Sequence, residues 1–395
     1  MSVSPLAGVL IVDLSRYLPG PYATRLLADL GARVIKVEEP GEGDPVRAAP
    51  PHRGGTSALA ALLLPGQESV ALDLKQPAAR EVLLALLERA DVLVETLRPG
   101  TLARLGLAPQ ELRRRFPRLV VCSLSGFGQD GPQAGRAGHD LTYQALAGLL
   151  APTAEMPSFP AADVLGSWAV ATSILAALYA REKSGEGAWI DTSMLDAAAH
   201  ANVAAWAVET GGPQPAGRRL PLTGAMACYN LYRAKDGGFV AFAPLEPRHW
   251  RRFCEDVGRR RWIARQFDRS PALRREVATL IATRTRGEWA EWFAARDFPG
   301  EPVLSAAEAA AHPQMRARGV LGRGPEGLPR LRYPARFDGA RPIGKDEMPG
   351  LGEHTGAVLA EWQRPEAAQR PRTLAARGIG SKWSWRRILW RLFSR

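Results

Sequence analysis

Short β-branched segments alternate with helical segments over the first 126 residues, and this rhythm restricts the chain to few folds. Helical patterns such as residues 21–32 and 78–90 separate the strand-like segments. Strands joined by helices form a mostly parallel sheet, which binds ligands at the carboxyl ends of its strands. The sequence therefore predicts an α/β fold with an open, Rossmann-like sheet. The expected strands lie at 8–14, 33–39, 69–74, 91–97 and 118–124.

The length of 395 residues predicts more than one domain. Residues 1–210 form the expected large α/β domain, which a Gly/Pro-rich linker at 211–217 ends. A smaller α+β domain is expected at 218–330, with a hairpin inside 228–245 that turns on Asp236-Gly237-Gly238. The expected remainder is a return segment to the large domain at 331–365 and a basic C-terminal extension at 366–395.

Composition and charge narrow the class of protein. Cys122, Cys228 and Cys254 are far apart and odd in number, which fits neither a disulfide framework nor a zinc site. The net charge is +12, but residues 366–395 hold eight basic residues and one glutamate, so the rest is too weakly basic for a nucleic-acid surface. Without a leader peptide pattern or an apolar run of membrane-span length, a cytoplasmic location is expected.

Three polar residues stand out as candidates for chemistry. His139 and Asp140 precede a helical pattern with Leu141 and Ala145 on one face, where Asp140 is suited to cap that helix. Asp163 begins a long apolar helix, whose backbone N–H groups could also stabilise developing negative charge. Glu246 follows a strand and precedes a proline. Taken singly, each carboxylate is better explained by a helix cap or a surface position than by catalysis.

Several motifs appear in one order along the chain. They are SRYLPGPYATRLLADLGARVIKVEEPG, SVALDLK, ADVLVETLRPGTLARLGL, VVCSLSGFGQDGP, GHDLTYQALAGLL and LGEHTGAVLAE. Together, from about residue 5 to 362, they resemble the family III CoA-transferases, a family that includes the 2-methylacyl-CoA racemases. The resemblance implies a coenzyme A thioester substrate, no permanently bound cofactor, and an interlocked homodimer or a heteromer with a paralogue.

The same resemblance implies roles for the three candidates. Asp163 matches a catalytic aspartate, which attacks the thioester in transferases and acts as an acid or base in racemases. His139 matches the second acid or base of the racemase branch, and Glu246 matches the glutamate that supports it. Pro19-Gly20-Pro21 is also closer to that branch. We therefore expect α-proton transfer, with CoA transfer through an aspartyl anhydride as the alternative.

The expected coenzyme A contacts are incomplete. Lys75, Arg98 and Arg104 stand at or near family positions that meet the nucleotide. Glu39, however, replaces a common arginine, and the segment with Gln67 and Glu68 replaces a basic motif. The loss of cations and the gain of anions at the coenzyme A pocket are expected to weaken CoA binding substantially. A catalytically weak paralogue that serves as a partner or scaffold subunit is therefore a further alternative.

A basic amphipathic segment, 381–395, extends beyond the family pattern. Arranged as a helix, it places Trp385, Ile388 and Leu392 on one face and Arg387 and Arg391 on the other. This pattern is typical of helices that lie on anionic membranes, while docking on protein and disorder are the alternatives.

Overall fold

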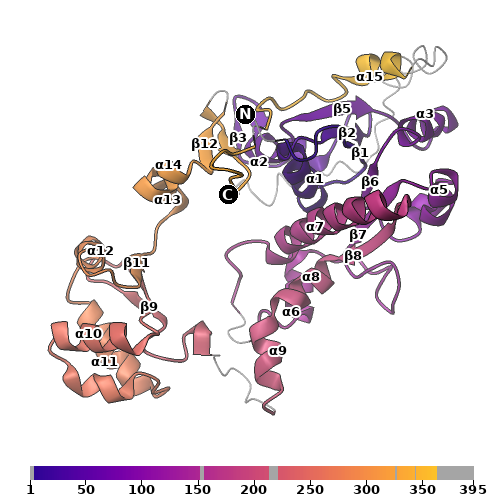
Figure 1. The fold of residues 1–395 in the computed structure, drawn as a ribbon. Coiled ribbons are helices and arrows are strands. Elements are labelled where there is room, and N and C mark those ends of the chain that lie inside the picture. Colours follow the sequence, from indigo (N-terminus) through magenta and orange to yellow (C-terminus); the bar gives the residue numbers. More distant parts are fainter. Residues whose placement is uncertain (1–3, 152–154, 213–220, 325–326, 343, 363–395) are drawn as a thin grey trace. The chain divides into compact units, whose positions relative to one another are not determined.

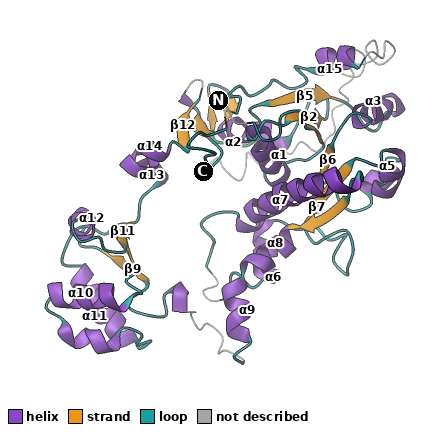
Figure 2. Cartoon of the chain, viewed as in Figure 1, coloured by secondary structure: helices purple, strands orange, loops and turns teal. Residues whose placement is uncertain are grey.

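The computed structural model describes residues 4–151, 155–212, 221–324, 327–342 and 344–362. These divide into two compact units, which Figures 1 and 2 show by element. Among the described residues, the first unit comprises those within 1–149, 157–201 and 313–362, and the second comprises those within 150–156 and 202–312. Residues 202–210 thus group with the second unit and 313–330 with the first, unlike the expected division at 210 and 330. Most of the expected linker and the whole basic extension lie outside the described residues.

Six parallel strands form the central sheet of the first unit. The strands are β1 (Leu10–Asp13), β2 (Arg33–Glu38), β5 (Gln67–Ala71), β6 (Val92–Glu95), β7 (Val120–Ser125) and β8 (Trp189–Ser193). Their order is β5-β2-β1-β6-β7-β8, and every pairing is parallel. The strand order therefore reverses between β1 and β6, and the carboxyl ends of these two strands flank the crevice in which such sheets bind ligands. The predicted α/β class is confirmed.

Helices cover both faces of this sheet (Figure 1). On one face, apolar side chains pack from α3 (Pro77–Leu87), α4 (Thr101–Arg104), α5 (Pro109–Arg115) and α15 (Thr355–Glu361). On the other face pack α1 (Pro19–Asp29) and α7 (Ala161–Ser184). By length and composition α7 could cross a membrane, but Val170, Ile174 and Leu178 bury it against the sheet. The face of α7 that packs against the sheet is therefore apolar because it belongs to the core.

Shorter elements complete the first unit. They are β3 (His52–Arg53), β4 (Thr56–Ser57), α2 (Ala58–Leu63), α6 (Asp140–Leu146), α8 (Met194–Ala201), α14 (Pro313–Arg318), β12 (Leu321–Arg323) and β13 (Pro329–Leu331). Of these, α6 packs against both α7 and α8. This packing brings the Gly-His-Asp segment beside the beginning of α7.

The second unit has its own aromatic core. Its antiparallel sheet pairs β10 (Phe239–Phe242) with β9 (Asn230–Arg233) and β11 (Gly300–Pro302), and Gly237 provides the positive φ of the predicted β9–β10 turn. Trp250, Phe253 and Trp289 are fully buried beside this sheet. The helices of the unit are α9 (Val203–Glu209), α10 (Pro247–Asp256), α11 (Pro271–Ile281), α12 (Arg286–Ala294) and α13 (Ala306–Ala311).

Candidate active site

A cavity of about 530 Å³ opens at the carboxyl ends of the first unit's strands. Its walls include Tyr17 after β1, Thr96–Pro99 after β6 and Ser125-Gly126 at the end of β7. The cavity therefore lies where the strand order predicts a ligand, and its volume suits a small-molecule site. Leu18, Val46, Leu59, Leu97, Leu124 and Met194 contribute apolar surface to it.

His139 and Asp163, the two residues predicted to exchange protons with a substrate, line this one cavity. His139 is the N-cap residue of α6 and is exposed. Asp163 lies in the first turn of α7, two residues beyond the start of the helix, and is partly buried. Side chains from two different helices thus reach the same space.

Asp140 links the two helices, but not in the way that the sequence suggests. It is the first residue of α6, and its Oδ1 accepts hydrogen bonds from the N–H groups of Ala162 at 2.8 Å and Asp163 at 3.1 Å. Its Oδ2 accepts a third from Gln144 at 2.6 Å. The prediction that Asp140 caps its own helix is therefore wrong, because it caps the beginning of α7 instead. The N–H groups of Ala162 and Asp163 are thereby occupied, so the predicted oxyanion role does not fit these two donors.

Burial and the neighbouring charge of Asp140 raise the pKa of Asp163 from 3.8 to about 7. Burial is the larger cause, because the charged carboxylate loses water, and the like charge of Asp140 adds to it. A carboxyl group with a pKa near neutrality can both accept and return a proton at physiological pH. The environment thus prepares Asp163 for acid–base chemistry.

Tyr143 also lines the cavity, and its ring explains the glycine of the Gly-His-Asp segment. Its ring is buried, and a Cβ atom at Gly138 would approach Tyr143 Cε1 to 2.6 Å. Burial, followed by the charge of Asp163, raises its pKa to about 12, so the phenol keeps its proton. The predicted face of α6 with Leu141 and Ala145 is exposed, whereas Tyr143 and Ala147 are buried.

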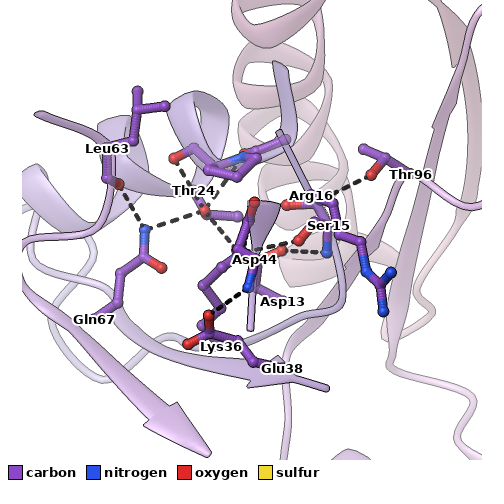
Figure 3. A network of polar contacts seen from close by, with 12 residues as sticks. Asp13, Ser15, Arg16, Thr24, Lys36, Glu38, Asp44, Leu63, Gln67 and Thr96 are labelled. Carbon is purple, nitrogen blue, oxygen red and sulfur yellow. Dashed lines mark hydrogen bonds and ion pairs between the residues drawn. The ribbon is translucent and has the colours of Figure 1, made fainter. Parts of the chain in front are cut away.

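Figure 3 shows a buried ionic network around Lys36, next to the segments that carry Tyr17 and Val46 of the cavity wall. Lys36 Nζ lies 3.0 Å from Asp44 Oδ2 and 3.4 Å from Asp13 Oδ2, and it donates a hydrogen bond to the carbonyl of Ser15 at 2.8 Å. Burial lowers the Lys36 pKa, but the surrounding carboxylates raise it further, so the net direction is upward. Lys36 therefore remains charged in the interior.

This network holds a strained residue of the cavity wall. Tyr17 has a φ of 67°, a left-handed conformation that costs a residue with a side chain about 1–2 kcal/mol. Its N–H donates to Asp44 Oδ1 at 3.0 Å, and the same oxygen accepts from the N–H of Val46 at 3.0 Å. The ion pair with Lys36 thus fixes Asp44, which in turn fixes two wall segments. Neither Tyr17 nor Lys36 has a sequence signal that separates it from neighbouring residues.

The three residues that are predicted to contact coenzyme A lie at the carboxyl end of the sheet, as the cavity does. Arg98 follows β6, is exposed and lines the cavity. Lys75 follows β5 and pairs with Glu39 at 2.9 Å, and Arg104 ends α4, where it donates to Thr101 Oγ1 at 2.7 Å. Lys75 and Arg104 do not line this cavity. Arg136 does line it and was missed, because a single arginine in a polar loop carries no signal.

Gln67 and Glu68 do not lie near the predicted coenzyme A contacts, contrary to the expectation from the basic family motif that they replace. They begin β5 and therefore lie at the amino edge of the parallel sheet. Gln67 is buried and donates to the carbonyl of Leu63, whereas Glu68 accepts two hydrogen bonds from Arg33 at 2.9 and 3.0 Å. Of the predicted unfavourable residues, only Glu39 lies at the carboxyl edge, where Lys75 pairs with it.

Glu246, the third predicted catalytic residue, belongs to the second unit. It is the N-cap residue of α10, and its carbonyl accepts from the N–H of His249 at 3.0 Å. Its expected support of His139 remains a prediction.

Comparisons with known proteins agree with this architecture. The family model described as CoA-transferase family III matches residues 6–355. The chain is 33% identical to the acetyl-CoA:oxalate CoA-transferase of Acetobacter aceti, covering 92% of this chain and 97% of that protein. It is also 33% identical to the alpha-methylacyl-CoA racemase of Homo sapiens, covering 90% and 93%. A crystal structure of a CaiB/BaiF family protein from Brucella suis superposes with a TM-score of 0.81 at 29% identity, covering 92% of this chain and all of that one.

Three observations agree on the family of this chain. They are the collinear motifs, the parallel sheet with its cavity at the carboxyl edge, and the family match over nearly the whole chain. The chain belongs to CoA-transferase family III.

Proposed function

We propose that the protein moves the α-proton of an acyl-CoA thioester and so inverts a 2-methylacyl or related centre. The observation that carries this proposal is the presence of His139 and Asp163 in one cavity. Racemisation at one carbon needs a base on one face and an acid on the other, and a transferase needs only the aspartate. The comparisons support acyl-CoA chemistry but include both activities at equal identity.

Two residues divide the proton transfer between them. In one direction the Asp163 carboxylate takes the proton from C2, and the electron pair of that C–H bond moves onto the thioester oxygen. Protonated His139 then gives its proton to the other face of C2, which forms the inverted centre. The reverse direction exchanges the two roles. The pKa of Asp163, raised to about 7, supports both roles near neutral pH.

The cavity also suits the rest of such a substrate. Its apolar wall, which includes Leu59, Leu97 and Met194, fits a branched acyl chain. Arg98 and Arg136 also line the cavity, and we expect their guanidinium groups to bind the phosphates of coenzyme A. We expect Lys75 and Arg104 to contribute further along the nucleotide.

The proposal includes an interlocked homodimer in which Glu246 supports His139. The exposed apolar side chains of Tyr179 in the first unit and Val203 in the second are 67% and 68% accessible, which suits surfaces that a second chain covers. A monomer by light scattering would contradict this part.

An isotope-exchange assay tests the proposal. A 2-methylacyl-CoA is incubated with the enzyme in deuterated water without an acceptor acid, and C2 is followed by mass spectrometry. We expect deuterium at C2 and loss of optical purity. Transfer of CoA to an added carboxylate without C2 exchange would favour the aspartyl anhydride, and absence of CoA binding would leave the weak paralogue that acts as a partner or scaffold subunit.

A further inference from the structure

Glu95 is a buried carboxylate at the carboxyl end of β6 that the proton transfer does not use. It is 3% exposed, and no ion pair to it is found among the described parts of the chain. Its Oε2 accepts a hydrogen bond from the N–H of Leu97 at 2.6 Å. A buried carboxylate without a cation costs free energy, so its retention beside the cavity needs an explanation.

The hydrogen bond joins Glu95 to the cavity wall. Thr96, Leu97, Arg98 and Pro99 all line the cavity, and they form the turn that leaves β6 at the point where the strand order reverses. Thr96 also binds the other side of this crevice, because its Oγ1 accepts from the N–H of Arg16 at 3.0 Å. Glu95 thus holds from below the turn that presents the exposed guanidinium of Arg98.

We propose that Glu95 is a positioning residue that fixes the Thr96–Pro99 turn and thereby aims Arg98 at the anionic part of the acyl-CoA. This inference rests on the proposed use of a CoA thioester at this cavity. The charged carboxylate makes a short, charge-assisted hydrogen bond to Leu97. Loss of that acceptor lets the turn move, and Arg98 then meets a phosphate less often.

The surroundings of Glu95 make its action pH-dependent. Burial raises its pKa from 4.5 to about 7, the Ser123 hydroxyl and the Leu97 N–H oppose this rise, and the charge of Asp191 adds to it. Cys122 on β7 stays a neutral thiol, since burial raises its pKa. Asp13 on β1 accepts a hydrogen bond from Thr24 and pairs with Lys36. Above pH 7 the carboxylate is therefore ionised and holds the turn more tightly.

Binding of coenzyme A by calorimetry tests this assignment with E95L, R98A and the double variant. We expect each single variant to raise the Kd about tenfold at pH 8, and the double variant to be no weaker than R98A within about twofold. E95Q keeps an acceptor for Leu97 and should recover most of the affinity. Additive losses in the double variant would overturn the proposal.

The matched control is Asp91, at the opposite end of the same strand. Its carboxylate also accepts a backbone hydrogen bond, from Leu10 at 2.7 Å, and pairs with Arg181. D91L should lower stability but leave the CoA affinity of the folded protein unchanged. An equal loss of affinity in D91L would reduce Glu95 to a structural role.

Amide hydrogen exchange over residues 94–99, without ligand, separates this inference from the proposed function. One outcome is that the Leu97 amide exchanges faster in E95L while the wild type does not bind CoA. This outcome would overturn the proposed function and coenzyme A as the ligand. Unchanged exchange and unchanged affinity in E95L would overturn the Glu95 assignment alone. If E95L does not fold, E95Q replaces it, and CoA affinity is measured as a function of pH in E95Q and in the wild type. We expect the affinity of the wild type to fall more steeply below pH 7 than that of E95Q. Identical pH profiles would contradict the proposal.

Discussion

The Asp140 carboxylate accepts a hydrogen bond from the backbone N–H of Asp163 at 3.1 Å, so the residue that begins α6 fixes the start of α7. The two carboxylates differ in their surroundings. Asp140 accepts three hydrogen bonds, whereas burial raises the pKa of Asp163 to about 7. A carboxyl group whose surroundings raise its pKa towards neutrality is suited to acid–base chemistry.

Removing the charge of Asp140 should therefore change the pH profile. In D140N the amide oxygen can still accept from Ala162 and Asp163, but the repulsion of a second charge is gone. We expect the pKa of Asp163 to fall and the acid limb of C2 exchange to move to lower pH, while burial keeps that pKa above 3.8. D130N, at an exposed carboxylate of the preceding loop, is the control. An acid limb that does not move in D140N contradicts the assigned cause.

Asp163 should lower stability at alkaline pH while it supports catalysis. Because its folded pKa exceeds its unfolded value of 3.8, the folded state binds more protons, and the free energy of unfolding decreases as pH rises from about 4 to 7. D163N removes this charge. We expect it to raise the free energy of unfolding by about 2 kcal/mol at pH 8, with little gain at pH 4. Urea titrations at both pH values measure the free energy of unfolding. An equal effect of D163N at pH 4 and pH 8 would refute the link between the Asp163 charge and stability.

Lys36 should matter far more to the fold than Lys75, although each pairs with a carboxylate near 3 Å. The side chain of Lys36 is 1% exposed and that of Lys75 is 76% exposed. K36M leaves Asp13 and Asp44 charged and buried without their cation, which should cost about 3–5 kcal/mol. K75M should cost less than about 1 kcal/mol. Similar midpoints for both variants in chemical denaturation would show that the network around Lys36 contributes little.

We also propose that residues 381–395 bind anionic membranes from the cytoplasmic side. Full-length protein should sediment with phosphatidylglycerol vesicles and less with phosphatidylcholine vesicles, because arginines favour anionic headgroups. Truncation at residue 380, or Gln at Arg387, Arg391 and Arg395, should remove the difference. Sedimentation that persists after truncation would assign the contact to another surface.

Five of the six strands of the large sheet could be predicted, because they are short β-branched runs between helical segments, whereas β8 was not among the expected strands. The position of the cavity followed as well, because parallel strands present their carboxyl ends at one edge. The role of Asp140 could not, since its partners Ala162 and Asp163 lie more than twenty residues away in the sequence. Gln67 was expected in the pocket because it stands where the family carries a basic motif, although a residue that begins a parallel strand lies at the amino edge of the sheet.

The burial of Lys36 was equally inaccessible to sequence reasoning. A lysine in a strand is normally solvated, and only the folded chain brings Asp13 and Asp44 to it. The same holds for Glu95, whose importance depends on the turn above it rather than on any local pattern.

Racemisation by H139A tests the central claim most directly, because His139 separates two-base proton transfer from chemistry that needs Asp163 alone. Each C2 epimer of a 2-methylacyl-CoA is incubated with wild type and H139A, and optical purity is followed by chiral chromatography. We predict that H139A racemises either epimer at least about 100-fold more slowly while CoA binding is retained. Racemisation by H139A at the wild-type rate would contradict the two-base assignment.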